Sequence, residues 1–248
     1  MQKLIKDIIE WIRKQVPEGG KAVIGISGGK DSTIAAALCV KALGKENVVG
    51  VMMPNGVQKD IDDSLRVCFL LGIPHMAINI GSAVNALCYE IDCGYDYDKC
   101  CINNPMIKTN LPARIRMTTL YAVAALYPNS RVVNTCNFSE DYVGYSTKYG
   151  DAAGDFSPLG YLTVREVLEI GDCLGLPYEL VHKTPSDGMC GKSDEDNLGF
   201  TYEELDAFLR DFKRPSPEKY ERIMQLHNST RHKYKPMPTF GLNREGKV

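Results

Sequence analysis

A glycine-rich octet between an apolar run and a helix-forming run constrains this chain more than any other stretch. Residues 25–32 read Gly-Ile-Ser-Gly-Gly-Lys-Asp-Ser, after Ala-Val-Ile at 22–24 and before the alanine-rich run 33–38. This order predicts a turn from a buried strand into a helix. Such turns bind anions, because glycines let backbone N–H groups approach a phosphate and the helix start adds unpaired donors. We therefore predict a phosphate site at residues 25–32.

Asp31 adds the need for a cation at this site. A carboxylate beside a polyphosphate repels it unless a divalent ion lies between them, and Mg²⁺ is usually held by one or two carboxylates plus substrate phosphates. The octet has neither Walker A spacing nor the G-x-G-x-x-G of a dinucleotide-binding turn. It resembles the S-G-G-x-D-S pyrophosphate loop of the ATP pyrophosphatases, which cleave ATP between the α- and β-phosphates. A glycine-rich connection without a ligand is the alternative.

Size and composition favour a single domain over residues 1–248, because α/β domains of this length are ordinary. With 29 basic and 31 acidic residues the formal charge is −2, which gives no electrostatic footprint for nucleic acid or an anionic membrane surface. The nine cysteines are an odd, scattered set that suits reduced thiols. The amphipathic N-terminus is unlike a secretory signal, and no apolar run is long enough for a membrane span. We expect a cytoplasmic protein.

Apolar runs and helical periods alternate along the chain and predict the fold class. Expected strands lie at 22–24, 48–53, 75–80 and 131–135, and expected helices at 3–16, 33–44, 61–71, 82–90, 110–127, 163–174, from 201 and 217–227. The helix at 110–127 is expected to open with Pro112 in its first turn, and the one from Thr201 has a capping-box pattern. A β-α-β-α-β order predicts a doubly wound, mostly parallel sheet with helices on both faces, a Rossmann-like α/β fold.

Polar residues gather at the expected carboxyl ends of these strands, where open α/β sheets bind ligands. Glu140 follows the strand at 131–135, which places it on the same rim as Asp31. The aperiodic loop 144–156 is rich in Gly, Lys and Asp, as functional or disordered loops are, and its aromatics and alternating charges favour function. Arg114 and Arg116 lie two residues apart and so point to different sides of a helix, with one able to reach a ligand and the other solvated.

Two other segments allow more than one interpretation. Cys93, Cys100 and Cys101 suggest zinc, but their spacing misses that of structural zinc sites, and a polar surface loop is the alternative. The tail at 228–236 is basic and then proline-containing, which fits a solvated end as well as a binding site.

A series of motifs covers the chain nearly from end to end. They are G-I-S-G-G-K-D-S at 25–32, N-L-P-A-R-I-R-M at 110–117, T-C-N-F-S-E at 135–140, T-K-Y-G-D-A-A-G-D at 147–155, P-S-D-G at 185–188, S-D-E-D-N-L-G-F-T-Y-E-E-L-D at 193–206 and R-H-K at 231–233. In combination they resemble the ammonia-dependent NAD synthetase family, within the ATP pyrophosphatase superfamily.

The resemblance implies a fold of the adenine nucleotide alpha hydrolase type and a defined reaction. In the family, the nicotinic acid carboxylate of deamido-NAD attacks the α-phosphorus of ATP, giving an acyl adenylate and pyrophosphate, and ammonia then displaces AMP. The length leaves no room for a glutamine-hydrolysing domain, so free ammonia is the expected donor unless a separate partner supplies it. The resemblance also implies a homodimer with the dinucleotide site at the subunit interface.

The resemblance assigns roles to residues by position. Asp31 and Glu140 are implied as Mg²⁺ ligands, and Asp31, Lys148 and Asp155 as catalytic residues, with Asp155 a candidate base for ammonium. The implied ATP contacts are Gly25, Ile26, Ser27, Gly28, Gly29, Lys30, Asp31, Ser32, Thr135 and Ser186. The implied deamido-NAD contacts are Arg114, Lys148, Asp155, His232 and Lys233.

One departure from the family pattern bears on turnover. The family has an ATP-contacting lysine where this chain has Val164, and Arg165 follows one residue later. One residue rotates a helical side chain by about 100°, so Arg165 need not substitute. Two alternatives stay open: a loop that activates another acceptor, as in tRNA thiolation, and a nucleotide-binding homologue with impaired turnover. The neutral charge and the lack of a C-x-x-C pair count against the first.

Overall fold

A parallel sheet forms the centre of the computed structural model, which describes residues 1–57, 61–94, 104–183 and 194–240. Within these residues the sheet has four strands in the order β3-β2-β1-β4, all parallel. The strands are β1 (Ala22–Gly25), β2 (Val48–Met52), β3 (His75–Ala77) and β4 (Arg131–Val133). The predicted doubly wound sheet is confirmed. β2 and β4 lie on opposite sides of β1. The direction in which strands are added to the sheet therefore reverses, and the switch point lies between β1 and β4.

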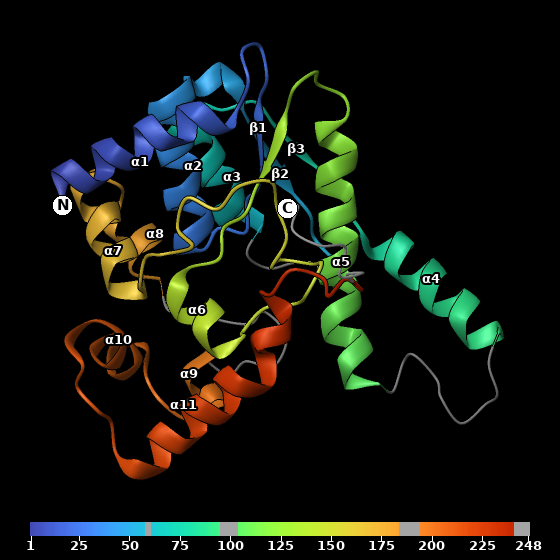
Figure 1. Cartoon of the computed structure of the whole chain (residues 1–248). Coiled ribbons are helices and arrows are strands. Elements are labelled where there is room, and N and C mark those ends of the chain that lie inside the picture. Colours follow the sequence, from blue (N-terminus) through green and yellow to red (C-terminus); the bar gives the residue numbers. More distant parts are fainter. Residues whose placement is uncertain (58–60, 95–103, 184–193, 241–248) are drawn as a thin grey trace, which may run out of the picture.

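Helices cover both faces of the sheet, as Figure 1 shows. One face, with Ile24 and Val133, packs against a core formed by α1 (Gln2–Gln15), α2 (Lys30–Leu43), α3 (Ile61–Leu71), α7 (Val164–Cys173) and α8 (Tyr178–Val181). The other face, with Val23 and Val132, packs against α4 (Gly81–Cys93) and α5 (Pro105–Ala124). Successive strand residues thus point to opposite sides and are buried on both, which explains their continuous Val and Ile runs.

A third apolar cluster joins α6 to the C-terminal helices at one end of the sheet (Figure 1). Its fully buried members are Val143, Leu205 and Ile223. The elements at this end are α6 (Phe138–Val143), α9 (Asp194–Leu198), α10 (Tyr202–Asp211), α11 (Pro217–Thr230) and the 3₁₀ turn η4 (Arg231–Lys233), while a further turn, η1 (Lys45–Asn47), precedes β2. In the part of the chain that is described, no helix is long and apolar enough to cross a membrane.

The start of α5 differs from the prediction. The helix was expected to open near Asn110, but the side chain of Asn104 accepts a hydrogen bond from the Met106 N–H at 2.9 Å and Pro105 occupies the first position. An asparagine cap followed by proline is a stronger start signal than the later Pro112. Pro112 therefore lies inside the helix. The short helix α6 is an element that helical periodicity did not predict.

Candidate active site

The predicted phosphate loop connects β1 to α2. Gly28 has φ +78°, and a Cβ built there would lie 2.9 Å from the Asp63 Cβ, so both backbone conformation and space require glycine. Gly29 caps α2 without any side-chain hydrogen bond to the first turn. The start of α2 therefore resembles the helix starts without a side-chain cap that bind anions.

Two serines hold this loop in shape. The Ser27 and Ser32 hydroxyls are 3.1 Å apart, and the Ser32 hydroxyl also accepts a hydrogen bond from the Ser27 N–H at 3.3 Å. The Ser27 hydroxyl in turn accepts the Gly29 N–H at 3.2 Å. Both hydroxyls thus stabilise the conformation of the loop before any phosphate binds.

Asp31 and Glu140 lie together at the switch point between β1 and β4. Asp31 is in the first turn of α2, after β1, and Glu140 is in the first turn of α6, after β4. Asn137 connects them: its amide Nδ2 donates to the Asp31 Oδ1 at 3.0 Å, and its Oδ1 accepts the Glu140 N–H at 3.0 Å. The prediction that both acids share one rim of the sheet is confirmed.

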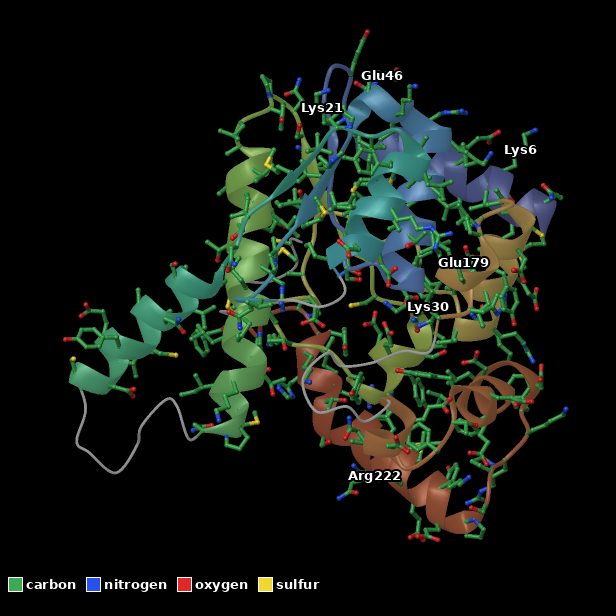
Figure 2. All side chains as sticks on the ribbon, turned by 180° about the vertical axis from the view of Figure 1, so that it is seen from behind. Lys6, Lys21, Lys30, Glu46, Glu179 and Arg222 are labelled. Atoms are coloured by element: carbon green, nitrogen blue, oxygen red, sulfur yellow. The ribbon has the colours of Figure 1, made fainter. Side chains whose placement is uncertain are left out.

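The electrostatics of the acidic pair favour the binding of a cation. Burial, followed by the negative charge of Asp31, raises the pKa of Glu140 to about 8, and Lys30 opposes the shift. The Lys30 ammonium is buried and lies 2.8 Å from the Asp31 Oδ2; Figure 2 shows Lys30 at the end of α2 that faces α6. Two acids beside one ammonium carry a net negative charge when ionised. A divalent cation would relieve their repulsion.

Ligands from a substrate could complete a metal site built on this pair. Across the described ranges, no three His, Cys, Asp or Glu side chains gather into a set that could hold a metal ion. Cys93 is exposed, and Cys100, Cys101 and the nucleotide candidate Ser186 lie outside the described residues. Thr135 is half-buried and lies two residues after the end of β4. Two carboxylates plus phosphate oxygens is the arrangement that Mg²⁺ prefers.

The dinucleotide candidates converge from three distant segments. The Arg114 Nε on α5 donates to the Lys148 carbonyl at 3.2 Å, and the Lys148 Nζ donates to the His232 carbonyl at 2.9 Å. The Lys233 Nζ donates to the carbonyls of Gly144 and Ser146, each at 2.7 Å. The C-terminal R-H-K segment therefore lies against the 144–148 loop. The tail therefore packs against the loop, and its role in binding stays a prediction.

The sequence left open which of the two arginines on α5 is solvated, and it is not Arg116. Its Nε donates to the Met53 carbonyl at 3.1 Å, just after β2, and burial lowers the pKa of its guanidinium while Asp151 opposes the shift. Arg114 is exposed. The two arginines do point to different sides of α5, and the inward one supports the end of a strand.

Asp155 lies apart from this group. Its Oδ2 accepts the Val132 N–H at 2.7 Å and its Oδ1 accepts the Tyr121 hydroxyl at 3.2 Å, beside β4 and α5. Burial and the Asp155 charge raise the pKa of Tyr121 to about 12, so the phenol remains a donor. No hydrogen bond within the described residues joins Asp155 to Lys148. The role of Asp155 stays a prediction.

The departure at position 164 has a structural explanation. The Val164 side chain is buried in the apolar cluster of α6, α10 and α11. The Arg165 guanidinium points away and pairs with both Asp211 oxygens on α10, at 3.1 and 3.2 Å. The Arg165 side chain is therefore engaged by α10, and its substitution for the family's lysine is not expected.

Asn137 is the site residue that sequence reasoning did not single out. It forms a capping box with Glu140, because its Oδ1 accepts the Glu140 N–H while Glu140 accepts the Asn137 N–H at 3.3 Å. The signal was available as an N-cap residue three positions before a glutamate, the same spacing that identified the helix at Thr201.

Comparisons with known proteins agree with this geometry. The family model described as NAD synthase matches residues 4–237 of this chain. The NH(3)-dependent NAD(+) synthetase of Alkaliphilus metalliredigens is 39% identical over 92% of this chain and 94% of its own length, and that of Thermococcus sibiricus is 41% identical over 84% and 79%. Among solved structures, an NMN synthetase from Francisella tularensis matches with TM-score 0.86 and 36% identity over 97% of this chain and 98% of its own. An NH3-dependent NAD synthetase from Campylobacter jejuni matches with TM-score 0.79 and 28% identity over 97% and 99%.

Proposed function

Because the chain belongs to the NAD synthase family, we propose that it is a C–N ligase that amidates deamido-NAD to NAD with ATP and ammonia. In the first step the substrate carboxylate attacks the α-phosphorus of ATP, forming an acyl adenylate and releasing pyrophosphate. In the second step ammonia attacks the acyl carbon, AMP leaves, and a proton is released from nitrogen. The observation that carries the proposal is the acidic pair beside the uncapped start of α2.

The phosphate loop and the acidic pair serve the first step. The first-turn N–H groups of α2 bind the pyrophosphate that leaves and stabilise its growing charge. Asp31 and Glu140 are the residues that would hold Mg²⁺, which when bound neutralises phosphate charge as a Lewis acid. The net negative charge of these acids with Lys30 fits a divalent ion. Thr135 and Ser186 are proposed further contacts to ATP.

The loop and tail serve the dinucleotide. Arg114, Lys148, His232 and Lys233 form one connected group in which cations can face the substrate phosphates and carboxylate. A positive Lys148 between two anionic reactants reduces their repulsion and helps bring them together. Asp155 is proposed to take the proton from ammonium; its carboxylate accepts hydrogen bonds from the Tyr121 hydroxyl and the Val132 N–H.

We propose a homodimer that works in the cytoplasm. Leu87 and Ile91 are exposed four residues apart on α4, which projects from the body (Figure 1) and offers an apolar stripe to a second copy. The described cysteines are free, as a reducing compartment would keep them.

Amidation of the mononucleotide is a second candidate. It is favoured by one observation, the TM-score of 0.86 to a protein named NMN synthetase. The two substrates share the nicotinic acid carboxylate that reacts. They differ in the adenylate half, which only the dinucleotide carries.

One assay separates these functions. The protein is incubated with ATP, Mg²⁺, ammonium and either deamido-NAD or nicotinic acid mononucleotide, and AMP, NAD and NMN are measured by chromatography. We expect AMP and NAD in equal amounts from deamido-NAD. A kcat/KM more than tenfold higher for the mononucleotide would select the second candidate. Nucleotide binding without release of AMP would contradict both and leave a binding protein.

A further inference from the structure

Asn137 is buried between the two acids of the site. It has no exposed surface, and its side chain uses both polar atoms: Nδ2 donates to the Asp31 Oδ1 and Oδ1 accepts the Glu140 N–H, each at 3.0 Å. Its backbone N–H donates to the Glu140 Oε2 at 3.3 Å. One residue thus contacts both carboxylates.

Helix capping explains only half of these contacts. The helices α7 and α10 begin with the same capping box, and there Thr163 and Thr201 provide the accepting oxygen. A cap needs an acceptor for the first-turn N–H groups and no amide group. The amide donor of Asn137 is therefore surplus to the cap, and it reaches Asp31, 106 residues earlier in the chain.

This donor fixes the orientation of the Asp31 carboxylate. Lys30 holds the Oδ2 at 2.8 Å and Asn137 holds the Oδ1, so the carboxylate plane is set from both sides. Each oxygen keeps a further lone pair. Since Asn137 is neutral, it orients the acid without adding a charge that would compete with a metal ion.

We propose that Asn137 is a positioning residue that sets Asp31 relative to Glu140 so that both bind one divalent cation. The inference rests on the proposed function, because it concerns the ion used with ATP. Partners that orient metal ligands commonly change metal affinity by 10–100-fold when they are removed.

The test variant is Asn137→Ser, which keeps a capping oxygen and loses the amide donor. Mn²⁺ binding is measured by electron paramagnetic resonance in the presence of α,β-methylene-ATP, which cannot be cleaved at the relevant bond. We expect the half-saturating Mn²⁺ concentration to rise by about 10–100-fold, with the KM for deamido-NAD changed less than about threefold. The matched control Thr201→Ser, at a cap facing Lys219, should bind Mn²⁺ as the unaltered protein does.

The outcomes separate the two hypotheses. Mn²⁺ affinity of Asn137→Ser within twofold of the unaltered protein would overturn the positioning role. Asn137→Thr, which keeps the cap and fills more space, is measured alongside; if neither variant folds by circular dichroism, the residue is structural and the proposal is wrong. Failure of the unaltered protein to make an amide, with Mn²⁺ binding weakened in the variant, would reject the proposed function and leave the positioning role standing.

Discussion

Helices α6 and α7 begin with the same capping box but meet opposite charges. In α6 the box joins Asn137 and Glu140, and in α7 it joins Thr163 and Glu166. Glu166 accepts two hydrogen bonds from Arg210, at 3.0 and 3.1 Å, whereas Glu140 faces Asp31. The same capping box therefore accompanies an ion pair with Arg210 in α7 and a pair of mutually repelling acids in α6.

The two glutamates show this difference in their pKa values. Burial raises the pKa of each, but in Glu166 the hydrogen bonds from Arg210 and from the Thr163 N–H more than offset burial and lower it overall. In Glu140 the charge of Asp31 adds to burial, and the pKa is raised to about 8. An acid held where its charge is unfavourable is a candidate functional residue, whereas the contact of Glu166 with Arg210 is a stabilising one.

The largest expected effect is on activity. Glu140→Gln should lower kcat/KM by about 10³-fold, because it removes a proposed ligand for the cation that would stabilise phosphate charge. Glu166→Gln should change kcat/KM by less than about threefold, since its partner is Arg210. Steady-state AMP formation measures both. Equal losses in the two variants would show that α7 is as much a part of the site as α6.

A smaller effect is expected on stability, with opposite signs in the two helices. Because the folded-state pKa of Glu140 is raised, the ionised glutamate destabilises the metal-free protein progressively as pH rises from about 5 to about 8. Glu140→Gln should therefore be the more stable protein at pH 8–9, by at least about 1 kcal/mol, the equivalent of one pKa unit. The advantage should shrink toward pH 5.

Glu166→Gln provides the contrast in the same experiment. The pKa of Glu166 is lowered on folding, so its charge stabilises the protein above its ordinary pKa, and this is lost as pH falls through the lowered folded value. The variant should be less stable than the unaltered protein at pH 8. Urea unfolding between pH 4 and 9 measures both variants. Parallel curves would contradict the assignment of opposite environments.

Local sequence was sufficient for the strand, loop and helix start that carry Asp31. The apolar runs of β1 and β2 predict strands because both faces are buried, and the glycine-rich octet predicts the loop, in which the turn requires Gly28. The six-residue helix α6 was not predicted, since it is too short for helical periodicity to register.

Contacts between segments far apart in the chain could not be predicted from local sequence. The pairing of Lys148 with the His232 carbonyl joins residues 84 positions apart. Family resemblance named these residues, but only the folded chain shows that the tail lies on the loop. The opposite partners of Glu140 and Glu166 are tertiary in the same way, because both helices carry the same local signal.

The smallest expected effect concerns Arg165, in the first turn of α7. Its guanidinium pairs with Asp211 at the surface, where ion pairs contribute little because water screens them. Arg165→Ala should shift the melting temperature by less than about 2 °C and leave the KM for ATP within twofold. Calorimetry and ATP titration measure these, with Asp211→Ala as the matched control. A tenfold rise in the KM for ATP in Arg165→Ala alone would mean that this arginine does replace the family's lysine, and α7 would then join α6 in the active site.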